Sequence, residues 1–319
     1  MDGMQKSYRI KELFPDYMRY LCKEMDKNRG RLQEIRLRVN QPLLLRMENQ
    51  EYFVGKEGEL SRQNHNSYIM KIEDMKSMIN YLCQYSLYAY ESEIKQGYFT
   101  IQGGHRIGVS GQIVSLDGEI KNMKYISSMN IRIAHEIMGA ADEVLPILYQ
   151  DGTLCSTMII SSPGCGKTTL LRDLVRQISD GNPFDRGRTV GVVDERSEIG
   201  GSYMGIPQNH IGMRTDILDA CPKIHGMMML IRAMSPYVVA VDEIGSKEDM
   251  QALKEVLRCG AHLLVTAHGA SLKEVQHKEW FHGIFQEALF KRFIVLESKD
   301  QVGKVEGIYD EKGTVLWKQ

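Results

Sequence analysis

The stretch SSPGCGKTTLLRD, residues 161–173, sets a lysine and two threonines directly behind a glycine. It fits the pattern G-x-x-x-x-G-K-[ST] at Gly166, Lys167 and Thr168, and it departs at the first position, where Ser161 replaces glycine. In loops of this pattern, backbone N–H groups converge on phosphate oxygens at the positive end of a helix, and glycines let the backbone approach without clashes. The stretch therefore predicts a phosphate-binding loop.

The residues of this loop predict ATP and Mg²⁺ as cofactors. We expect Lys167 to reach the β- and γ-phosphates and Thr168 to offer its hydroxyl to Mg²⁺. The residues expected to bind the nucleotide are Ser162, Pro163, Gly164, Cys165, Gly166, Lys167, Thr168 and Thr169. The apolar run before the loop and the helical pattern after it are the context that such a motif requires; the alternative is a chance Gly-Lys-Thr in an unrelated loop.

An acidic pair, Asp242 and Glu243, follows the apolar run YVVAV at the end of another predicted strand. Open α/β sheets bind ligands at the carboxyl ends of their strands. We therefore expect Asp242 to hold Mg²⁺ through water and Glu243 to polarise the attacking water. An acidic pair in this position can instead cap a turn or a helix. Its place after a phosphate loop within one α/β pattern favours nucleotide chemistry.

Two more apolar runs end in polar side chains. The run TVGVVD is followed by Glu195 and Arg196, and HLLVTAHG contains Thr266 and His268. Parallel strands with polar residues at the same end predict a catalytic rim, in which Glu195 and His268 are further candidates for catalysis. Thr266 or His268 is a candidate sensor of the γ-phosphate, whereas a lone histidine behind a strand is normally structural; geometry decides between these.

The second half of the chain alternates apolar strands with helices. Strands are expected at residues 156–161, 189–194, 237–242 and 262–267, and helices at 167–179, 223–234 and 247–259. Continuous apolar strands that alternate with helices predict a mainly parallel sheet covered on both faces. Three further strands, at 292–298, 305–310 and 314–318, predict a β-meander with a hairpin turn at 310–313.

The first half predicts a domain of helices and strands. Helices are expected at residues 11–25, 71–86, 88–95 and 140–152, and strands at 34–39, 98–101, 103–114 and 127–134. A chain of 319 residues commonly forms two domains, and we place the boundary near the last of these helices. The predicted fold class is α/β, with an α+β domain at residues 1–150 followed by a P-loop domain at residues 151–319.

The charge balance and the cysteines argue against several classes of protein. Forty basic against 41 acidic residues give a net charge of −1, which argues against a strongly basic nucleic-acid binder and a polybasic membrane binder. The six cysteines are scattered without a C-x-x-C pair, which indicates reduced thiols in a cytoplasm and argues against zinc. No apolar stretch approaches the roughly 18 residues of a membrane span.

The core resembles RecA-like ATPases, and in particular the hexameric secretion ATPases of type II and type IV systems and pilus motors. Those proteins carry a phosphate loop (Walker A), an acidic box, a Walker B and a histidine box of the kind that LLVTAHG presents. The run LIRAMSPYVVAVDEIG is similar to their Leu-Arg…Pro-Asp…Gly-Glu-Ile run and puts Arg232 at the arginine position. It departs in having Tyr237 for the aspartate and Asp242 for the glycine, which is closer to an AAA-type Walker B.

Over nearly the whole chain, the motifs resemble one family, stage III sporulation protein AA of endospore-forming bacteria. The matching stretches are SLYAYESEIKQGYFTIQGGHRIGVSG, SSMNIRIA, TVGVVDERSEIGG, MRTDILDACPK and VAVDEIG. The resemblance implies a mother-cell ATPase of the cytoplasm, peripheral at the membrane through a partner. That partner is a membrane-embedded channel between mother cell and forespore.

Secretion ATPases place arginines of an N-terminal β-rich domain against the nucleotide, often from a neighbouring subunit. GGHRIGVSG and NIRIA are similar to those strands and nominate Arg106 and Arg132 as arginine fingers; the alternative is that both are surface arginines on an alternating strand. Arg214, in a long loop, is a third candidate. A site completed in trans implies a homo-oligomeric ring, a hexamer.

The leading hypothesis is a ring-forming, Mg²⁺-dependent motor ATPase that energises a sporulation channel. The alternative is a nucleic-acid translocase or helicase with the same core; the near-zero net charge and the lack of a basic-aromatic stripe count against a nucleic-acid partner. A third hypothesis is a scaffold that binds ATP and scarcely hydrolyses it, against which the presence of Glu243 argues.

Overall fold

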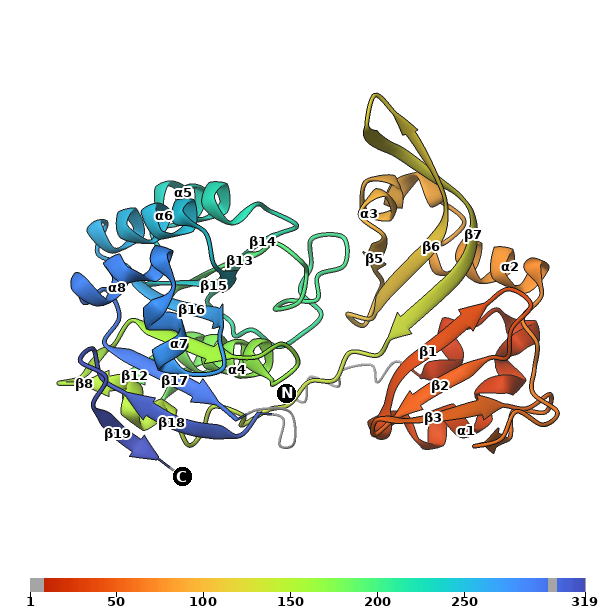
Figure 1. Cartoon of the computed structure of the whole chain (residues 1–319), viewed down its shortest axis with the longest axis horizontal. Helices are drawn as coiled ribbons and strands as arrows, with labels where there is room; N and C mark the ends of the chain where they lie inside the picture. Colours follow the sequence, from red (N-terminus) through yellow and green to blue (C-terminus); the bar gives the residue numbers. More distant parts are fainter. Residues whose placement is uncertain (1–8, 298–302, 319) are drawn as a thin grey trace. The chain divides into compact units, whose positions relative to one another are not determined.

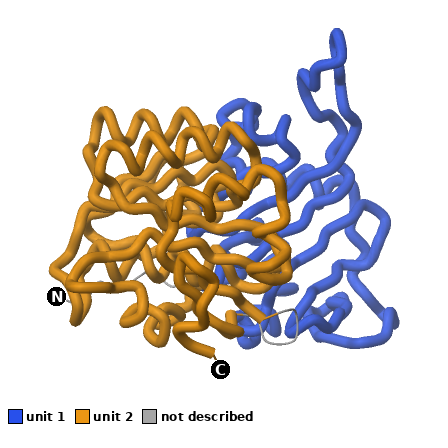
Figure 2. Tube along the Cα trace, turned by 60° about the vertical axis from the view of Figure 1, so that its left-hand side comes forward, with its two compact units in different colours: residues 1–135 blue, residues 136–319 orange. Residues whose placement is uncertain are grey.

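The computed structural model describes residues 9–297 and 303–318 of the chain (Figure 1). The chain forms two compact units, residues 1–135 and residues 136–319 (Figure 2). Residues 136–150, which the sequence places with the first domain, lie in the second unit, because Val144 and Leu148 are buried in its core. Among the described residues, no helix combines the length and the apolar character that a membrane crossing needs.

The first unit is built on one antiparallel sheet with the strand order β4-β3-β2-β1-β7-β6-β5. The strands are β1 Leu32–Arg38, β2 Leu44–Met47, β3 Gln50–Val54, β4 Leu60–Ser61, β5 Tyr98–Thr100, β6 Arg106–Leu116 and β7 Glu119–Arg132. The α-helices are α1 Lys23–Lys27, α2 Ile72–Leu82 and α3 Glu91–Lys95, and the 3-10 helices are η1 Ile10–Leu13, η2 Asp16–Cys22, η3 Arg29–Arg31 and η4 Leu87–Tyr90.

The predicted helix at 11–25 is broken in the structure into η1, η2 and α1. Phe14 is extended (φ −116°, ψ 141°) directly before Pro15. A proline ring disfavours the helical conformation of the residue before it and removes an N–H donor, so the helix cannot run through. The predicted helices at 71–86 and 88–95 are confirmed as α2 and as η4 with α3, whereas β2, β3 and β4 were not predicted.

The second unit is built on a mainly parallel sheet, as the sequence predicts, with the order β14-β13-β15-β16-β10-β17-β18-β19. The six strands from β14 to β17 in this order pair in parallel, and β18 and β19 pair antiparallel. The strands of this sheet are β10 Thr157–Ser161, β13 Val190–Asp194, β14 Thr215–Asp219, β15 Val238–Ile244, β16 His262–His268, β17 Arg292–Leu296, β18 Val305–Tyr309 and β19 Val315–Lys318. The helices are η5 Leu145–Leu148, α4 Lys167–Asp180, α5 Lys223–Ala233, α6 Lys247–Arg258, α7 Leu272–His277, η6 Glu279–Phe281 and α8 His282–Gln286. Short hairpins pair β8 Tyr149–Gln150 with β9 Thr153–Leu154 and β11 Gly181–Asn182 with β12 Asp185–Arg186.

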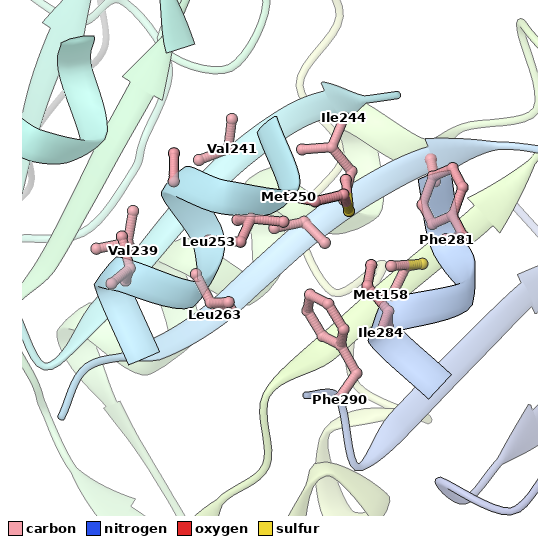
Figure 3. Packing of buried hydrophobic residues seen from close by; sticks show 14 of the residues in the cluster. Met158, Val239, Val241, Ile244, Met250, Leu253, Leu263, Phe281, Ile284 and Phe290 are labelled. Carbon is pink, nitrogen blue, oxygen red and sulfur yellow. The ribbon is translucent and has the colours of Figure 1, made fainter. Parts of the chain in front are cut away.

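The residues of each central strand alternate between two cores. In β10, Met158 and Ile160 belong to the core that α5, α6, α7 and α8 cover, whereas Ile159 belongs to the core that α4 covers. Figure 3 shows the first core, where Leu253 of α6 and Phe281 of η6 pack among the residues of the strands. The sheet is therefore the middle layer, and the carboxyl ends of its parallel strands meet at one edge.

The structure differs from the sequence expectation in two places of this unit. The predicted helix at 140–152 is the 3-10 turn η5 followed by the β8–β9 hairpin. Asp151 and Gly152 both adopt positive φ (51° and 75°) and form the two-residue turn of that hairpin. Strand β14 was not predicted, because TDILD is half-buried throughout and has no apolar run. The β-meander is confirmed in β17, β18 and β19, while Ser298 lies outside the described residues.

Candidate active site

A loop of residues 162–166 joins β10 to α4 at the carboxyl edge of the sheet. Gly164 and Gly166 adopt left-handed conformations (φ 79° and 94°), which other residues rarely allow. Gly166 is the N-cap of α4, so no side chain caps this helix, and its first turn, Lys167 to Thr169, contains no carboxylate. The positive end of the helix dipole is therefore not offset locally, which is the geometry that binds an anion.

Lys167 is buried, with 5% of its surface exposed, and its ammonium turns back over the loop. Its Nζ lies 3.1 Å from the carbonyl oxygen of Ser161, 3.2 Å from that of Ser162 and 3.2 Å from Nδ1 of His268. Because an ammonium only donates, Nδ1 accepts, and the ring proton of a neutral imidazole then sits on Nε2. Burial lowers the pKa of Lys167, although nearby carboxylates oppose this effect. The lysine of the motif thus links the loop to the end of β16.

Asp242, near the end of β15, accepts hydrogen bonds from two threonines. The Oγ1 of Thr168 donates to its Oδ2 at 2.7 Å, and the hydroxyl of Thr266 donates to its Oδ1. Mg²⁺ prefers oxygen donors and usually takes only one or two carboxylates of the protein beside water and phosphate oxygens. The Thr168–Asp242 pair fits such a magnesium site.

The carboxylate of Glu243 accepts from two donors. Nε2 of His268 lies 3.1 Å from Oε1, and Arg196, which follows β13, pairs with Oε2. Only 22% of the glutamate side chain is exposed. Together with the lysine contact described above, these bonds form a continuous chain from Lys167 through His268 to Glu243. The structure therefore brings together three of the residues that the sequence nominates for catalysis.

Glu195 also lies at this edge, where it pairs with Lys223, a residue that sequence reasoning missed. Its Oε2 lies 3.3 Å from Nζ of Lys223, and the same Nζ lies 2.8 Å from the backbone oxygen of Glu243. Lys223 is the first residue of α5, whose first turn has no acidic residue. A cation at the positive end of a helix is unfavourable. A lysine at the first position of a predicted helix is therefore the sequence signal that could have identified Lys223.

Two charged side chains, Asp194 and Arg172, fix the loop that follows β13. Asp194, with 1% of its surface exposed, accepts N–H bonds of 2.8 to 3.0 Å from Glu198, Ile199 and Gly200. Arg172 of α4 donates to the carbonyl oxygens of Glu198 and Ile199 at 2.6 and 2.7 Å. Burial raises the pKa of Asp194 to about 6, although the three N–H groups oppose the shift. The base of the loop beside the site is thereby held in one conformation.

We expect Asp194 to make the folded protein less stable as the pH rises from about 5 to about 7. Its raised pKa means that the folded state holds this proton more tightly than the unfolded state does. The resulting stability is complete below the unfolded pKa of 3.8 and is lost as the pH rises through about 6. The full difference is about 3 kcal/mol. Urea unfolding at both pH values should show a flatter dependence for Asp194→Asn than for the wild type; equal dependences would contradict the assignment.

The family described as "Sporulation stage III, protein AA" matches residues 4–316 of the chain. The chain belongs to this family. Stage III sporulation protein AA of Bacillus subtilis (strain 168) is 41% identical over 308 residues, which cover 96% of each of the two chains. The resemblance seen in the sequence motifs is thereby confirmed.

Two solved structures share the fold of this sporulation family member. The ATPase DotB of Legionella pneumophila aligns with a TM-score of 0.57 at 12% identity, over 93% of this chain and 81% of that chain. The pilus retraction motor PilT with bound ADP aligns with a TM-score of 0.53 at 11% identity, over 86% of this chain and 77% of that chain. At such identities the likeness establishes the fold alone. It confirms the predicted class, a RecA-like α/β core preceded by an α+β domain.

In this member of the sporulation family, two of the predicted arginines lie away from the residues of the site. Arg232 is exposed in the last turn of α5. That turn is roughly 13 Å along the helix axis from Lys223. The Nη1 of Arg214 lies 2.9 Å from the carbonyl oxygen of Ser179 in the last turn of α4. The guanidinium of Arg214 therefore caps the end of α4 that is remote from the phosphate loop.

Arg106 and Arg132 belong to the first unit, where they face each other across β6 and β7. The guanidinium of Arg106 lies 3.7 Å over the ring of Tyr98, and Arg132 lies 3.9 Å from a carboxylate oxygen of Glu34. Both side chains thus have partners within their own unit. Their action as arginine fingers stays a prediction.

We expect Arg214→Met to lower the free energy of unfolding by about 1 kcal/mol, because it removes the cation and the donor that cap α4. Turnover of ATP should stay near the wild-type rate, because the capped end of α4 is remote from the phosphate loop. Urea unfolding and phosphate release measure the two effects. A large loss of turnover at unchanged stability would instead support Arg214 as an arginine finger that acts on a neighbouring copy.

Proposed function

We propose that this protein is a Mg²⁺-dependent ATP hydrolase. The observation that carries the proposal is the unbroken chain of contacts from Lys167 through His268 to Glu243, beside the Thr168–Asp242 pair. These groups match the needs of phosphoryl transfer to water: a cation for the phosphates, oxygens for a metal and a carboxylate for the water. A fold shared with an ATPase and with a motor that binds ADP supports the same reaction.

The residues divide the work as follows under this proposal. The nucleotide phosphates draw the ammonium of Lys167 away from its present acceptors, and residues 162–169 bind them through backbone N–H groups. Thr168 and Asp242 would hold Mg²⁺, which supplies charge neutralisation when it is bound. Glu243 takes the proton of a water whose oxygen bonds to the γ-phosphorus, while the bond to the β–γ bridging oxygen breaks. The products are ADP and inorganic phosphate.

His268 and Glu195 have supporting roles in the proposal. When Lys167 turns to the phosphates, Nδ1 of His268 loses its donor, while Nε2 still faces Glu243 at 3.1 Å. His268 can thus report the presence of the phosphates to Glu243, which is the role of a sensor. Glu195 is the second carboxylate of the edge and holds Lys223.

We further infer that the protein works as a homo-oligomeric ring, a hexamer, in the manner of type II and type IV secretion ATPases. An arginine from a neighbouring copy, Arg106, Arg132 or Arg214, would complete the site. ATP hydrolysis by this ring would energise a sporulation channel between mother cell and forespore. The protein would lie in the mother-cell cytoplasm and reach the membrane through membrane-embedded channel proteins. The sporulation name of the Bacillus subtilis relative supports this setting.

Phosphate release from ATP by the purified chain, with Mg²⁺ and with EDTA, tests the reaction. We expect turnover only with Mg²⁺. Sedimentation with a non-hydrolysable ATP analogue should show a species several times larger than the 36.4 kDa chain. Tight ATP binding without phosphate release would contradict the hydrolase and favour the nucleotide-gated scaffold.

A further inference from the structure

We propose that Lys223 is a positioning residue that sets the backbone of Glu243 and thereby aims its carboxylate. The inference rests on the proposed function, because it concerns the residue that polarises the attacking water in that reaction. In this role Lys223 touches neither ATP nor the attacking water; it acts through Glu243.

The place of Lys223 in the chain is electrostatically unfavourable. It follows Pro222 and is the first residue of α5, whose first turn carries no acidic residue. A cation there faces the positive end of the helix dipole, where negative charge is preferred. The side chain is also largely buried, with 19% exposed. Proteins depart from such local preferences mainly at functional sites. A cation at the start of α5 is therefore a sign of a functional role.

The ammonium of Lys223 joins the ends of two neighbouring parallel strands. Nζ lies 2.8 Å from the backbone oxygen of Glu243, in β15, and 3.3 Å from Oε2 of Glu195, which follows β13. Strands β13 and β15 are direct neighbours in the sheet. One lysine therefore fixes the relative position of two carboxylate-bearing strand ends at the candidate site.

The backbone of Glu243 needs such a partner. Its φ of 54° is left-handed, a conformation that costs free energy in any residue with a side chain. The pairing of β15 with β16 is irregular between Val241 and Ile244, so the regular ladder does not hold this residue. The N–H of Glu243 donates to Oγ1 of Thr266 at 2.8 Å, and Lys223 binds its carbonyl oxygen. A donor on one side and an acceptor on the other thus hold the strained residue in place.

The backbone conformation of Glu243 determines the direction in which its carboxylate points. In the held conformation, Oε1 lies 3.1 Å from Nε2 of His268. Without Lys223, the carbonyl of Glu243 loses its charged donor, and relaxation toward an extended backbone redirects the side chain. A small displacement of a catalytic group is enough to lower a rate by orders of magnitude. Loss of Lys223 should therefore affect the chemical step and spare nucleotide binding.

The variant Lys223→Met tests this, because methionine keeps an unbranched stem of similar length and removes the charge. The matched control is Lys247→Met, since Lys247 is likewise the first residue of its helix, α6, and is exposed. We expect kcat of Lys223→Met to fall by about tenfold or more, with KM for ATP and the Kd of a fluorescent ATP analogue within about twofold of wild type. Lys223→Arg, which keeps a donor and a charge, should recover part of kcat, and Lys247→Met should behave as wild type.

A double variant separates positioning from a general structural role. If Lys223 acts through Glu243, then Lys223→Met should lower the residual rate of Glu243→Gln by less than twofold, because the two effects are not independent. Additive losses, an unchanged kcat in Lys223→Met, or a Kd weakened in step with kcat would each overturn the inference. A wild-type chain without hydrolysis overturns the proposed function and this role with it. An active wild type beside a fully active Lys223→Met overturns the role of Lys223 alone.

Discussion

We expect Lys167→Ala to abolish ATP turnover and to weaken nucleotide binding by about a hundredfold or more. Lys167 is the only cation among residues 161–169, so no other side chain of the loop can take its place. Charge-assisted hydrogen bonds are worth about 1.5–3 kcal/mol each, and two lost bonds to phosphate account for this factor. Binding of a fluorescent ATP analogue and phosphate release measure the two losses.

The fold should survive this substitution. Both acceptors that Lys167 leaves behind keep another donor: the N–H of Gly269 donates to the carbonyl oxygen of Ser161 at 3.3 Å, and the hydroxyl of Ser161 donates to the carbonyl oxygen of Ser162 at 2.9 Å. Lys312→Ala, at an exposed lysine in the turn between β18 and β19, is the matched control and should keep wild-type turnover. Hydrolysis at the wild-type rate in Lys167→Ala, with a normal unfolding midpoint, would mean that the loop is not the nucleotide site.

Much of the second unit could be predicted from the sequence because its central strands are continuous apolar runs. Such runs identify strands that are buried on both faces, and burial on both faces identifies a parallel sheet. Strand β14 was not predicted, because TDILD is half-buried at every position and so lacks the apolar run that marks a buried strand. The helix expected at 140–152 failed for a local reason, since the Asp151–Gly152 turn that ends it also forms a hairpin. The break at Pro15 was readable in principle, because a proline disfavours a helical residue before it.

The candidate site was predictable to the extent that it consists of strand ends. Asp242 and His268 lie at the ends of apolar runs, and Thr168 follows the loop behind another; parallel strands bring such residues to one edge. Lys223 was not predictable in this way, because it stands at the start of a helix and not at the end of an apolar strand, and strand β14 before it was not predicted. Arg232 was nominated for the site because it lies in the run LIRAMSPYVVAVDEIG. In the structure it lies in the last turn of α5, at the end of the helix that is remote from the carboxyl edge of the sheet.

Glu243→Gln should bind Mg²⁺ and ATP as the wild type does and hydrolyse ATP at least about a hundredfold more slowly. The amide oxygen of glutamine can still accept the hydrogen bond from Nε2 of His268, which lies 3.1 Å from Oε1 in the wild type. The amide has no negative charge to take a proton from water, so the loss falls on the chemical step. Single-turnover phosphate release, started by adding Mg²⁺ to the complex with ATP, isolates that step.

Glu195→Gln is the matched control, because Glu195 is a carboxylate at the same edge with a different partner. It pairs with Lys223, is 40% exposed and does not belong to the contact chain from Lys167 through His268 to Glu243. We therefore expect a smaller loss of turnover than in Glu243→Gln. The reverse order, with Glu243→Gln active and Glu195→Gln inactive, would transfer the polarisation of water to Glu195. Lys223 contacts the carboxylate of Glu195 but only the backbone oxygen of Glu243. Glu195→Gln therefore removes the charge that faces Lys223, whereas Glu243→Gln leaves the backbone contact in place and tests the carboxylate of Glu243 alone.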